Sequence, residues 1–200
     1  ETVMVPDRYV RASDCDGALG AANNPEWKTV ALNDDGELVL PHGAVGFRWG
    51  PDGRPDQGQW NLEAKEATHG GDVKLKLTVQ EGLNPSTETA RIGFPYFGGV
   101  ESKYFPNNAT GAGANSVLVR TVPVQRLRLG DDKKETLVAT VFDLLVANYG
   151  VARGLPGELA ATSFDDDTPY TPAWQERITG TPREQVIAVA RQFADNADKT

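Results

Sequence analysis

The sequence predicts a mixed fold of the α+β type: a β-rich, loop-heavy lobe over residues 1–139 and a helical segment over residues 140–200. In the first part, several short runs alternate apolar and polar residues, which is the period of a half-buried strand. In the second part, apolar residues recur every three or four positions between helix start and stop signals. The 21 glycines and 13 prolines of the chain bound these runs and keep the elements short.

The first strand signal is a β-hairpin between residues 27 and 40. Apolar and polar side chains alternate from Trp27 to Leu32, and a second apolar run follows at residues 37–40. Between them the chain reads Asn-Asp-Asp-Gly, residue types that favour a tight turn because they tolerate left-handed backbone angles. We therefore expect two short antiparallel strands here.

The most regular alternation in the chain lies at residues 72–79, where we expect a strand. Residues 117–129 alternate again up to a break at Pro123, turn at residues 130–132 and lead into a further strand at residues 135–139. The remaining expectations are a short helix at 7–20, a packed loop with short strands at 41–63, an extended piece at 92–97 and a mobile loop at 100–116.

Three helices are expected in the last sixty residues. The first begins at Thr140, presents Val141, Leu144, Leu145 and Tyr149 on one face, and ends at Gly150. After a connector at residues 155–171, the other two begin at Thr171-Pro172 and Thr181-Pro182, each a capping residue followed by proline at the first helical position. A capping-box Glu184 follows Thr181, Gly180 separates the two helices, and the last has a stripe of Val186, Val189, Ala190, Phe193 and Ala194.

Composition excludes several classes of function. The net charge is −8 with a pI of about 4.8, and no basic patch is present, so a nucleic-acid partner is not expected. Cys15 is the single cysteine, too few for a disulfide framework or for a zinc or iron–sulfur motif. No run of about 20 apolar residues predicts a membrane span.

No residue pattern predicts catalysis or a metal site. His42 and His69 lie on glycine-rich loops without a third ligand at a useful spacing, and Asp165–Asp167 fit an acidic connector that favours the following helix start better than a cation site. The two acidic stretches around Cys15 and at residues 131–132 have the same interpretation. An aromatic set could form a ligand platform, but a lobe core is the better interpretation; it consists of Trp27, Phe47, Trp49, Trp60, Phe94, Tyr96 and Phe97.

Several stretches resemble a known family. They are YTPAWQERITGTPREQVIAVARQFADNADKT from Tyr170, NNPEWKTVALN from Asn23, GFRWG from Gly46, QWNLE from Gln59, GFPYFGG from Gly93 and TVFDLLVANYGVARGL from Thr140. Together they cover almost the whole chain, in order. They resemble the alpha (catalytic) subunit of membrane-bound respiratory nitrate reductase, in the molybdopterin oxidoreductase family. Because that subunit is several times longer, we expect this chain to be an internal fragment.

The resemblance implies an enzyme that reduces nitrate to nitrite at molybdenum held by two molybdopterin guanine dinucleotides. Electrons arrive from quinol through iron–sulfur clusters, including a 4Fe-4S cluster in the alpha subunit. It also implies an iron–sulfur beta subunit, a membrane-anchoring gamma subunit, and a position at the cytoplasmic face of the bacterial membrane. The helices of residues 140–200 would belong to an incomplete α/β molybdopterin-binding domain.

The family's cluster ligands and its molybdenum-ligating Asp have no counterpart in this sequence. We therefore expect no catalytic residue and no metal ligand within residues 1–200, and the cofactor contacts stay unassigned. Two hypotheses follow: a scaffold segment of the nitrate reductase catalytic subunit, inactive alone, or a stand-alone protein- or ligand-binding module without enzymatic activity. The first predicts exposed apolar surface on the isolated chain, whereas the second predicts a cooperative domain that covers it.

Overall fold

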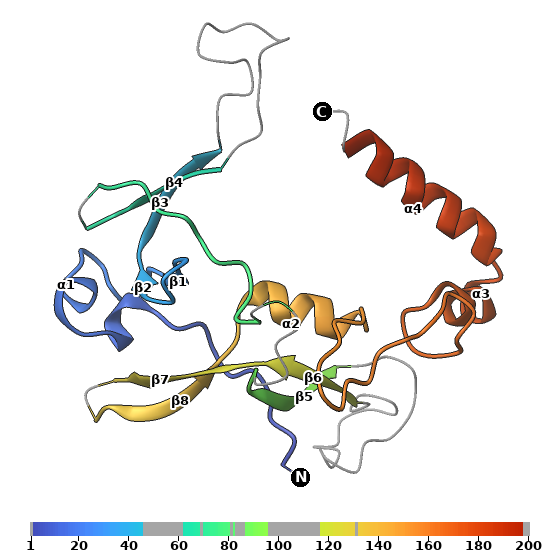
Figure 1. Cartoon of the computed structure of the whole chain (residues 1–200), viewed down its shortest axis with the longest axis horizontal. Coiled ribbons are helices and arrows are strands. Elements are labelled where there is room, and N and C mark those ends of the chain that lie inside the picture. Colours follow the sequence, from blue (N-terminus) through green and yellow to red (C-terminus); the bar gives the residue numbers. More distant parts are fainter. Residues whose placement is uncertain are drawn as a thin grey trace, which may run out of the picture. The chain divides into compact units, whose positions relative to one another are not determined.

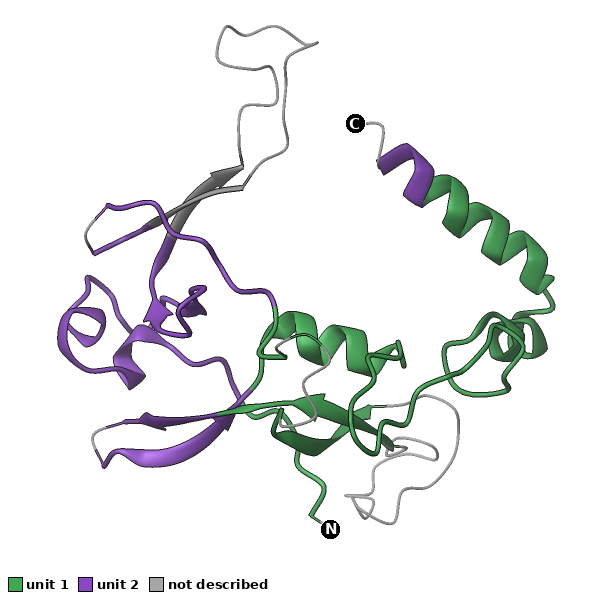
Figure 2. Cartoon of the chain, viewed as in Figure 1, with its two compact units in different colours: residues 1–7, 78–125, 139–193 green, residues 8–77, 126–138, 194–200 purple. Residues whose placement is uncertain are grey.

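The computed structural model describes residues 2–45, 62–68, 70–80, 82, 87–95, 117–130 and 132–197. These residues form mixed helices and small antiparallel sheets, as expected for an α+β chain. Figure 1 shows the elements in sequence colours, and Figure 2 separates two compact units that each draw on distant parts of the sequence. Unit 1 comprises residues 1–7, 78–125 and 139–193, and unit 2 comprises residues 8–77, 126–138 and 194–200.

Unit 1 is built on the antiparallel pair β5 (Thr89–Pro95) and β6 (Val117–Pro123), with α2 (Val141–Asn148) packed against β6. The register pairs Ala90 with Val122 and Ile92 with Arg120, so these four side chains lie on one face of the hairpin. The hydrophobic core lies between this face and α2. Its buried members are Ile92, Phe94, Val122 and Ala147, with Ala90, Ala139 and Leu144 packed at its margin.

Helix α2 has the ends that the sequence predicts. The Thr140 side chain accepts a hydrogen bond from the Asp143 amide, which satisfies one of the free amides of the first turn. Gly150 follows the helix with φ of +71°, a left-handed conformation that glycine adopts without steric cost. The sequence does not predict correctly, however, which apolar residues of this helix face the core. Leu144 faces the core, whereas Val141, Leu145 and Tyr149 point away from it and are exposed.

Helices α3 (Pro172–Thr179) and α4 (Arg183–Ala197) confirm the paired start signals at the end of the chain. The Thr171 hydroxyl accepts from the Trp174 amide, Pro172 occupies the first turn, and Gly180 ends α3 with φ of +75°. Neither helix contains a buried residue. Local sequence signals therefore predict that these two helices form, but they do not predict whether the helices are buried.

Unit 2 contains a 3-10 turn at Ala12–Asp14 and the short helix α1 (Gly17–Gly20) in place of the longer helix expected over residues 7–20. The expected hairpin is present as β1 (Ala31–Leu32) and β2 (Leu38–Val39), with Gly36 in the left-handed conformation. Two further pairs complete the unit: β3 (Pro41–Val45) with β4 (Leu62–Glu66), and β7 (Gln125–Leu129) with β8 (Lys134–Val138).

The strand expected at residues 72–79 is wrong. This segment forms no strand; Leu75 makes an isolated antiparallel bridge with Asn33, flanked by hydrogen bonds of Lys74 and Lys76 to residues 34 and 32, and Leu77 is 67% exposed. Alternation alone does not make a strand, because a strand also needs a neighbour that continues the hydrogen-bond ladder. The aromatic core is half confirmed in the described part of the chain. Phe94 is buried, whereas Trp27 is 80% exposed.

Several sequence expectations fall outside the described residues. They concern the mobile loop at residues 100–116, the aromatic residues Phe47, Trp49, Trp60, Tyr96 and Phe97, and His69. The backbone of His42 lies in β3, paired with Lys65 of β4.

Candidate functional site

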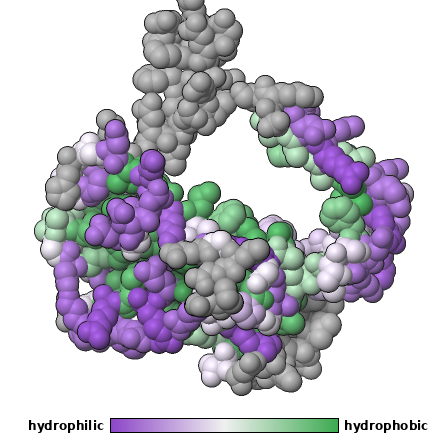
Figure 3. All heavy atoms as spheres, in the orientation of Figure 1, coloured by the Kyte–Doolittle hydropathy of each residue, from purple (hydrophilic) through white to green (hydrophobic). Residues whose placement is uncertain are grey.

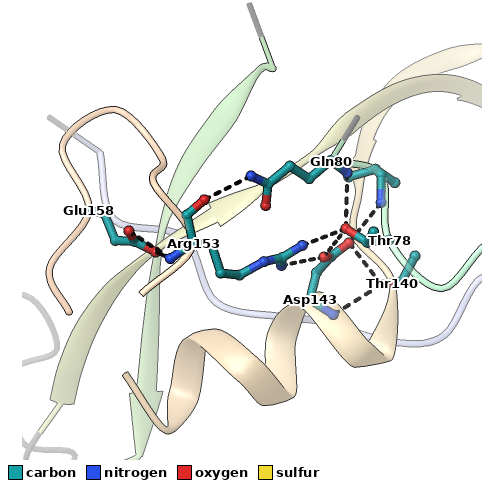
Figure 4. A network of polar contacts seen from close by, with 7 residues as sticks. Thr78, Gln80, Thr140, Asp143, Arg153 and Glu158 are labelled. Atoms are coloured by element: carbon teal, nitrogen blue, oxygen red, sulfur yellow. Dashed lines mark hydrogen bonds and ion pairs between the residues drawn. The ribbon is translucent and has the colours of Figure 1, made fainter. Parts of the chain in front are cut away.

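The most elaborate polar cluster of unit 1 is centred on Asp143, in the first turn of α2 (Figure 4). Asp143 is fully buried. Its Oδ2 atom accepts from the Thr140 hydroxyl at 2.8 Å and from the Val79 amide at 3.0 Å. Its Oδ1 atom accepts from the Thr78 hydroxyl at 2.5 Å and from Nη1 of Arg153 at 2.5 Å.

Arg153 extends the cluster into the connector that follows α2. Its Nη2 atom donates to the Thr78 hydroxyl at 2.7 Å, and its guanidinium carbon lies 5.7 Å from the ring centre of Phe142. The Arg153 amide donates to both carboxylate oxygens of Glu158, at 2.8 and 2.9 Å. The Arg153 carbonyl accepts from the Gln80 side-chain amide at 3.0 Å. The cluster therefore joins residues 78–80, α2 and residues 153–158, three segments that are distant in sequence.

This arrangement is suited to holding the backbone rather than to chemistry. Both Asp143 oxygens already accept two hydrogen bonds, so neither has a free lone pair with which to bind a substrate. A buried carboxylate is stable only when its charge is paired and its lone pairs are satisfied, and both conditions hold here. We assign this cluster, the Asp143 clamp, a structural role.

A second buried charge, Arg120 of β6, lies at the other end of α2. Its guanidinium donates to the carbonyl of Leu159 and, at 3.4 Å, to that of Pro169. It also lies against Gly150, where a Cβ would come within 2.7 Å of Nη2. The negative end of the α2 dipole and these carbonyls face the cation. Burial lowers the pKa of Arg120 from its usual value, the result expected for a charge removed from water.

Arg120 borders the small cavity of this region. The cavity has a volume of about 10 Å³, room for about one water molecule, and its lining includes Thr121, Gly150 and Glu158. The Arg120 Nε atom is buried without a hydrogen-bond partner, so a single water there would complete its bonding. A cavity of this size does not admit an organic substrate.

Four of the sequence candidates that the structure describes, Cys15 and Asp165–Asp167, have local surroundings of their own. Burial raises the pKa of the Cys15 thiol, with the Asp14 charge adding to the shift, which disfavours the reactive thiolate. Asp165 and Asp167 form ion pairs with Arg183 and Arg177. Asp166 accepts from the Thr162 amide at 2.6 Å, and this hydrogen bond is the main cause of its lowered pKa. The acidic stretch is a connector held by ion pairs and hydrogen bonds.

The residues that the structure describes offer no ligand set for the metal cofactors that the resemblance implies. Within the described part of the chain, no three His, Cys, Asp or Glu side chains gather as a metal-binding group. No reaction step through molybdenum or an iron–sulfur cluster is therefore assigned to these residues. None of the helices in the described ranges is long and apolar enough to cross a membrane.

Sequence reasoning missed both buried charges. Asp143 was visible as the single charged residue in an otherwise apolar helix, three positions after the capping Thr140. A charge at such a position needs a buried partner, and this was the available signal. The identity of that partner, Arg153, depends on the path of the connector and could not be read from spacing.

Comparison with known proteins finds relatives whose names agree, since each is a nitrate reductase alpha chain or alpha subunit. The chain is 49% identical over 193 residues to the respiratory nitrate reductase 1 alpha chain of Escherichia coli (strain K12), covering 96% of this chain and 14% of that protein. It is 36% identical over 200 residues to the nitrate reductase alpha chain of Bacillus subtilis (strain 168), covering 99% of this chain and 14% of that protein. A nitrate reductase alpha subunit of Mycobacterium tuberculosis (strain ATCC 25618 / H37Rv) is 34% identical over 203 residues. No family model matches the chain.

The resemblance stated from the sequence is thus confirmed by relatives that match nearly all of these 200 residues. The chain spans about a seventh of the length of each. It belongs to the family of nitrate reductase alpha chains, of which it represents one segment.

Proposed function

We propose that this chain is a scaffold segment of a respiratory nitrate reductase catalytic subunit, an oxidoreductase that reduces nitrate to nitrite. The observation that carries the proposal is 49% identity to a respiratory nitrate reductase alpha chain over 96% of these residues. Identity at this level over almost two hundred residues implies the same local fold and the same place in the larger protein. The segment contributes structure, and the reacting groups belong to the rest of the subunit.

The polar clusters support a scaffold role. The Asp143 clamp and Arg120 both use their charges to fix backbone segments, and both leave no open position for a substrate. The exposed apolar residues of α2 and α4 also suit a segment that packs against further polypeptide. They do not favour the alternative of a stand-alone binding module, which would cover such residues internally.

The finer assignments rest on family membership. We propose that the complete subunit carries molybdenum with two molybdopterin guanine dinucleotides and a 4Fe-4S cluster, neither ligated by these residues. In that protein, residues 140–200 would be part of an α/β molybdopterin-binding domain and residues 1–139 a β-rich elaboration of it. The complete subunit would assemble with an iron–sulfur beta subunit and a membrane-anchoring gamma subunit at the cytoplasmic face of the bacterial membrane, in anaerobic respiration.

A chimera tests the proposal. The corresponding segment of the Escherichia coli alpha chain is replaced by these 200 residues, and nitrate reduction by the purified complex is measured with a reduced viologen dye. We expect activity within about tenfold of the parent, since a shift of one tenfold corresponds to only about 1.4 kcal/mol in the barrier. The isolated 200-residue chain should be inactive. A chimera that assembles with its metal content intact yet does not reduce nitrate would contradict the proposal, as would turnover by the isolated chain.

A further inference from the structure

Helix α2 is apolar on both sides. Its inner side, with Leu144 and Ala147, packs on the core of unit 1. Its outer side presents Val141, Leu145 and Tyr149, which are 59%, 53% and 55% exposed. These three residues follow the spacing of one helical face and form what we call the outer face of α2. The helix carries one charge, that of Asp143, and Asp143 is buried.

A helix with one covered side normally places polar residues on its other side, because water solvates them there. A helix that is apolar all round is found in the interior of a larger structure. Space-filling colours show hydrophobic atoms at the surface in the region of α2 (Figure 3). The composition of α2 is therefore that of an interior helix with a second layer over Val141, Leu145 and Tyr149.

The outer face of α2 continues through aromatic contacts toward α3. The Tyr149 ring meets Tyr170 edge to face at 5.5 Å between ring centres, and Tyr170 meets Trp174 in the same way at 5.4 Å. One turn after Trp174, Ile178 is exposed. This chain of contacts makes α2 and the start of α3 one continuous apolar surface.

Contacts of Arg120 with the backbone next to Tyr170 and Tyr149 fix the arrangement of this apolar surface. Tyr170 has φ of +73°, a left-handed conformation that is strained for a bulky residue. The Arg120 guanidinium binds the carbonyl of the preceding Pro169 and packs against Gly150, the residue after Tyr149. Such strain persists only where surrounding contacts fix it. The aromatic rings are therefore arranged before any partner arrives.

We propose that the outer face of α2 is covered, in the complete subunit, by an apolar segment of the same alpha chain that lies outside these 200 residues. The inference rests on the proposed function. The relatives that match this chain are about seven times its length, since it spans 14% of them, so most of an alpha chain is available to supply the cover. The absence of charge on the outer face suits a permanent contact of the kind found inside a domain.

A second copy of this chain is a poorer occupant. Three half-exposed side chains offer on the order of a few hundred Å² of apolar surface, whereas a stable dimer needs about 800 Å² from each partner. A contact within one polypeptide has no such requirement, because the covalent chain already holds the two surfaces near each other.

Site-specific photo-crosslinking in the complete subunit tests the proposal. Tyr149, an aromatic residue, is replaced by p-benzoylphenylalanine in the alpha chain that carries these residues, and crosslinked peptides are identified by mass spectrometry. We expect crosslinks within one alpha chain to peptides outside residues 1–200. The matched control places the same probe at Lys134, an exposed residue of β8, where we expect at least fivefold fewer such crosslinks. Crosslinks to another alpha chain, to a different subunit or only within these 200 residues would overturn the proposal.

A second variant tests the proposal independently, in case the substitution at Tyr149 prevents folding. Leu145→Cys is labelled with a maleimide in the isolated chain and in the complete subunit, with Lys134→Cys as the control. We expect labelling at least tenfold slower for Leu145→Cys in the complete subunit and an equal rate for the control. Equal rates for Leu145→Cys in both proteins would contradict the inference. Nitrate reduction by the unsubstituted chimera separates the cases: an active chimera without protection refutes this inference alone, whereas an inactive one refutes the proposed function.

Discussion

Helices α2 and α4 begin after similar sequence signals and yet end in opposite environments. Helix α2 has eight residues, packs on the β5–β6 hairpin and carries the buried Asp143. Helix α4 has fifteen residues and an apolar stripe, but no residue of it is buried, and Phe193 is 79% exposed. The comparison teaches that caps and periodicity decide whether a helix forms, while burial depends on a partner that local sequence does not specify.

The largest effect expected on the α2 side comes from breaking the Asp143 clamp. Asp143→Ala removes the carboxylate that pairs with Arg153 and leaves a guanidinium that is 13% exposed without its counter-charge. We expect the free energy of unfolding of the chain, from urea titration followed by circular dichroism, to fall by about 3–5 kcal/mol. The matched control, Asp195→Ala on exposed α4, should change it by less than about 0.5 kcal/mol. Similar losses for both variants would remove the distinction between the two helices.

One substitution made in both regions sharpens the comparison further. Val122→Ala opens a cavity in the core beneath α2, because Val122 is completely buried, and should cost about 2 kcal/mol. Val189→Ala on α4 removes the same two methyl groups from a side chain that is 65% exposed, and should cost about 0.5 kcal/mol or less. In the complete subunit, the Val189→Ala cost should rise toward that of Val122→Ala. A large cost in the isolated chain would show that α4 is already covered there.

A smaller effect is expected from the helix cap. Thr140→Ala removes the acceptor of the Asp143 amide and a donor to the Asp143 carboxylate. We expect a loss of about 1 kcal/mol, with Thr140→Ser retaining most of the wild-type stability because its hydroxyl can make both bonds. Thermal unfolding of the two variants checks this. Equal melting temperatures for Thr140→Ala and the wild type would mean that packing alone holds α2.

The smallest expected effect comes from removing the exposed ion pair between Arg8 and Asp14. Arg8 donates to both Asp14 oxygens, at 2.6 and 2.7 Å, and this bonding is the main reason that the pKa of Asp14 is lowered from 3.8. Because the folded pKa lies below the unfolded one, the contribution is complete above pH 3.8 and is lost as the pH falls through the folded value. In an acid titration, the wild type should be more stable than Asp14→Asn by a constant amount above pH 3.8, and the difference in stability should shrink as the pH falls below that value. A difference that grows above neutral pH would contradict the assignment.

The elements that the sequence predicted are those whose ends are defined by nearby residues. Thr140, Thr171 with Pro172, and Gly180 define helix ends through single hydrogen bonds or backbone angles, and all are found where expected. The turn at Gly36 belongs to the same class. Each of these features needs only a few consecutive residues, so a single sequence contains enough information to predict them.

The features that sequence reasoning missed depend on distant residues. The regular alternation at residues 72–79 forms no strand: its backbone contacts with residues 32–34 are those of an isolated bridge at Leu75 and do not continue as a ladder. The face of α2 was predicted from periodicity, but which side meets the sheet is set by the Asp143 clamp and by Gly150 against Arg120. Tertiary contacts of this kind override local pattern.

Amide hydrogen exchange compares the two regions most directly. It is measured on the isolated 200-residue chain and on the complete alpha chain, following peptides of β5–β6 and of α4. We predict protection of β5–β6 in both proteins, and for α4 fast exchange in the isolated chain with at least a hundredfold slowing in the complete chain. If α4 exchanges equally slowly in both, the helix needs no partner, and the description of this chain as a scaffold completed by the rest of its subunit is wrong.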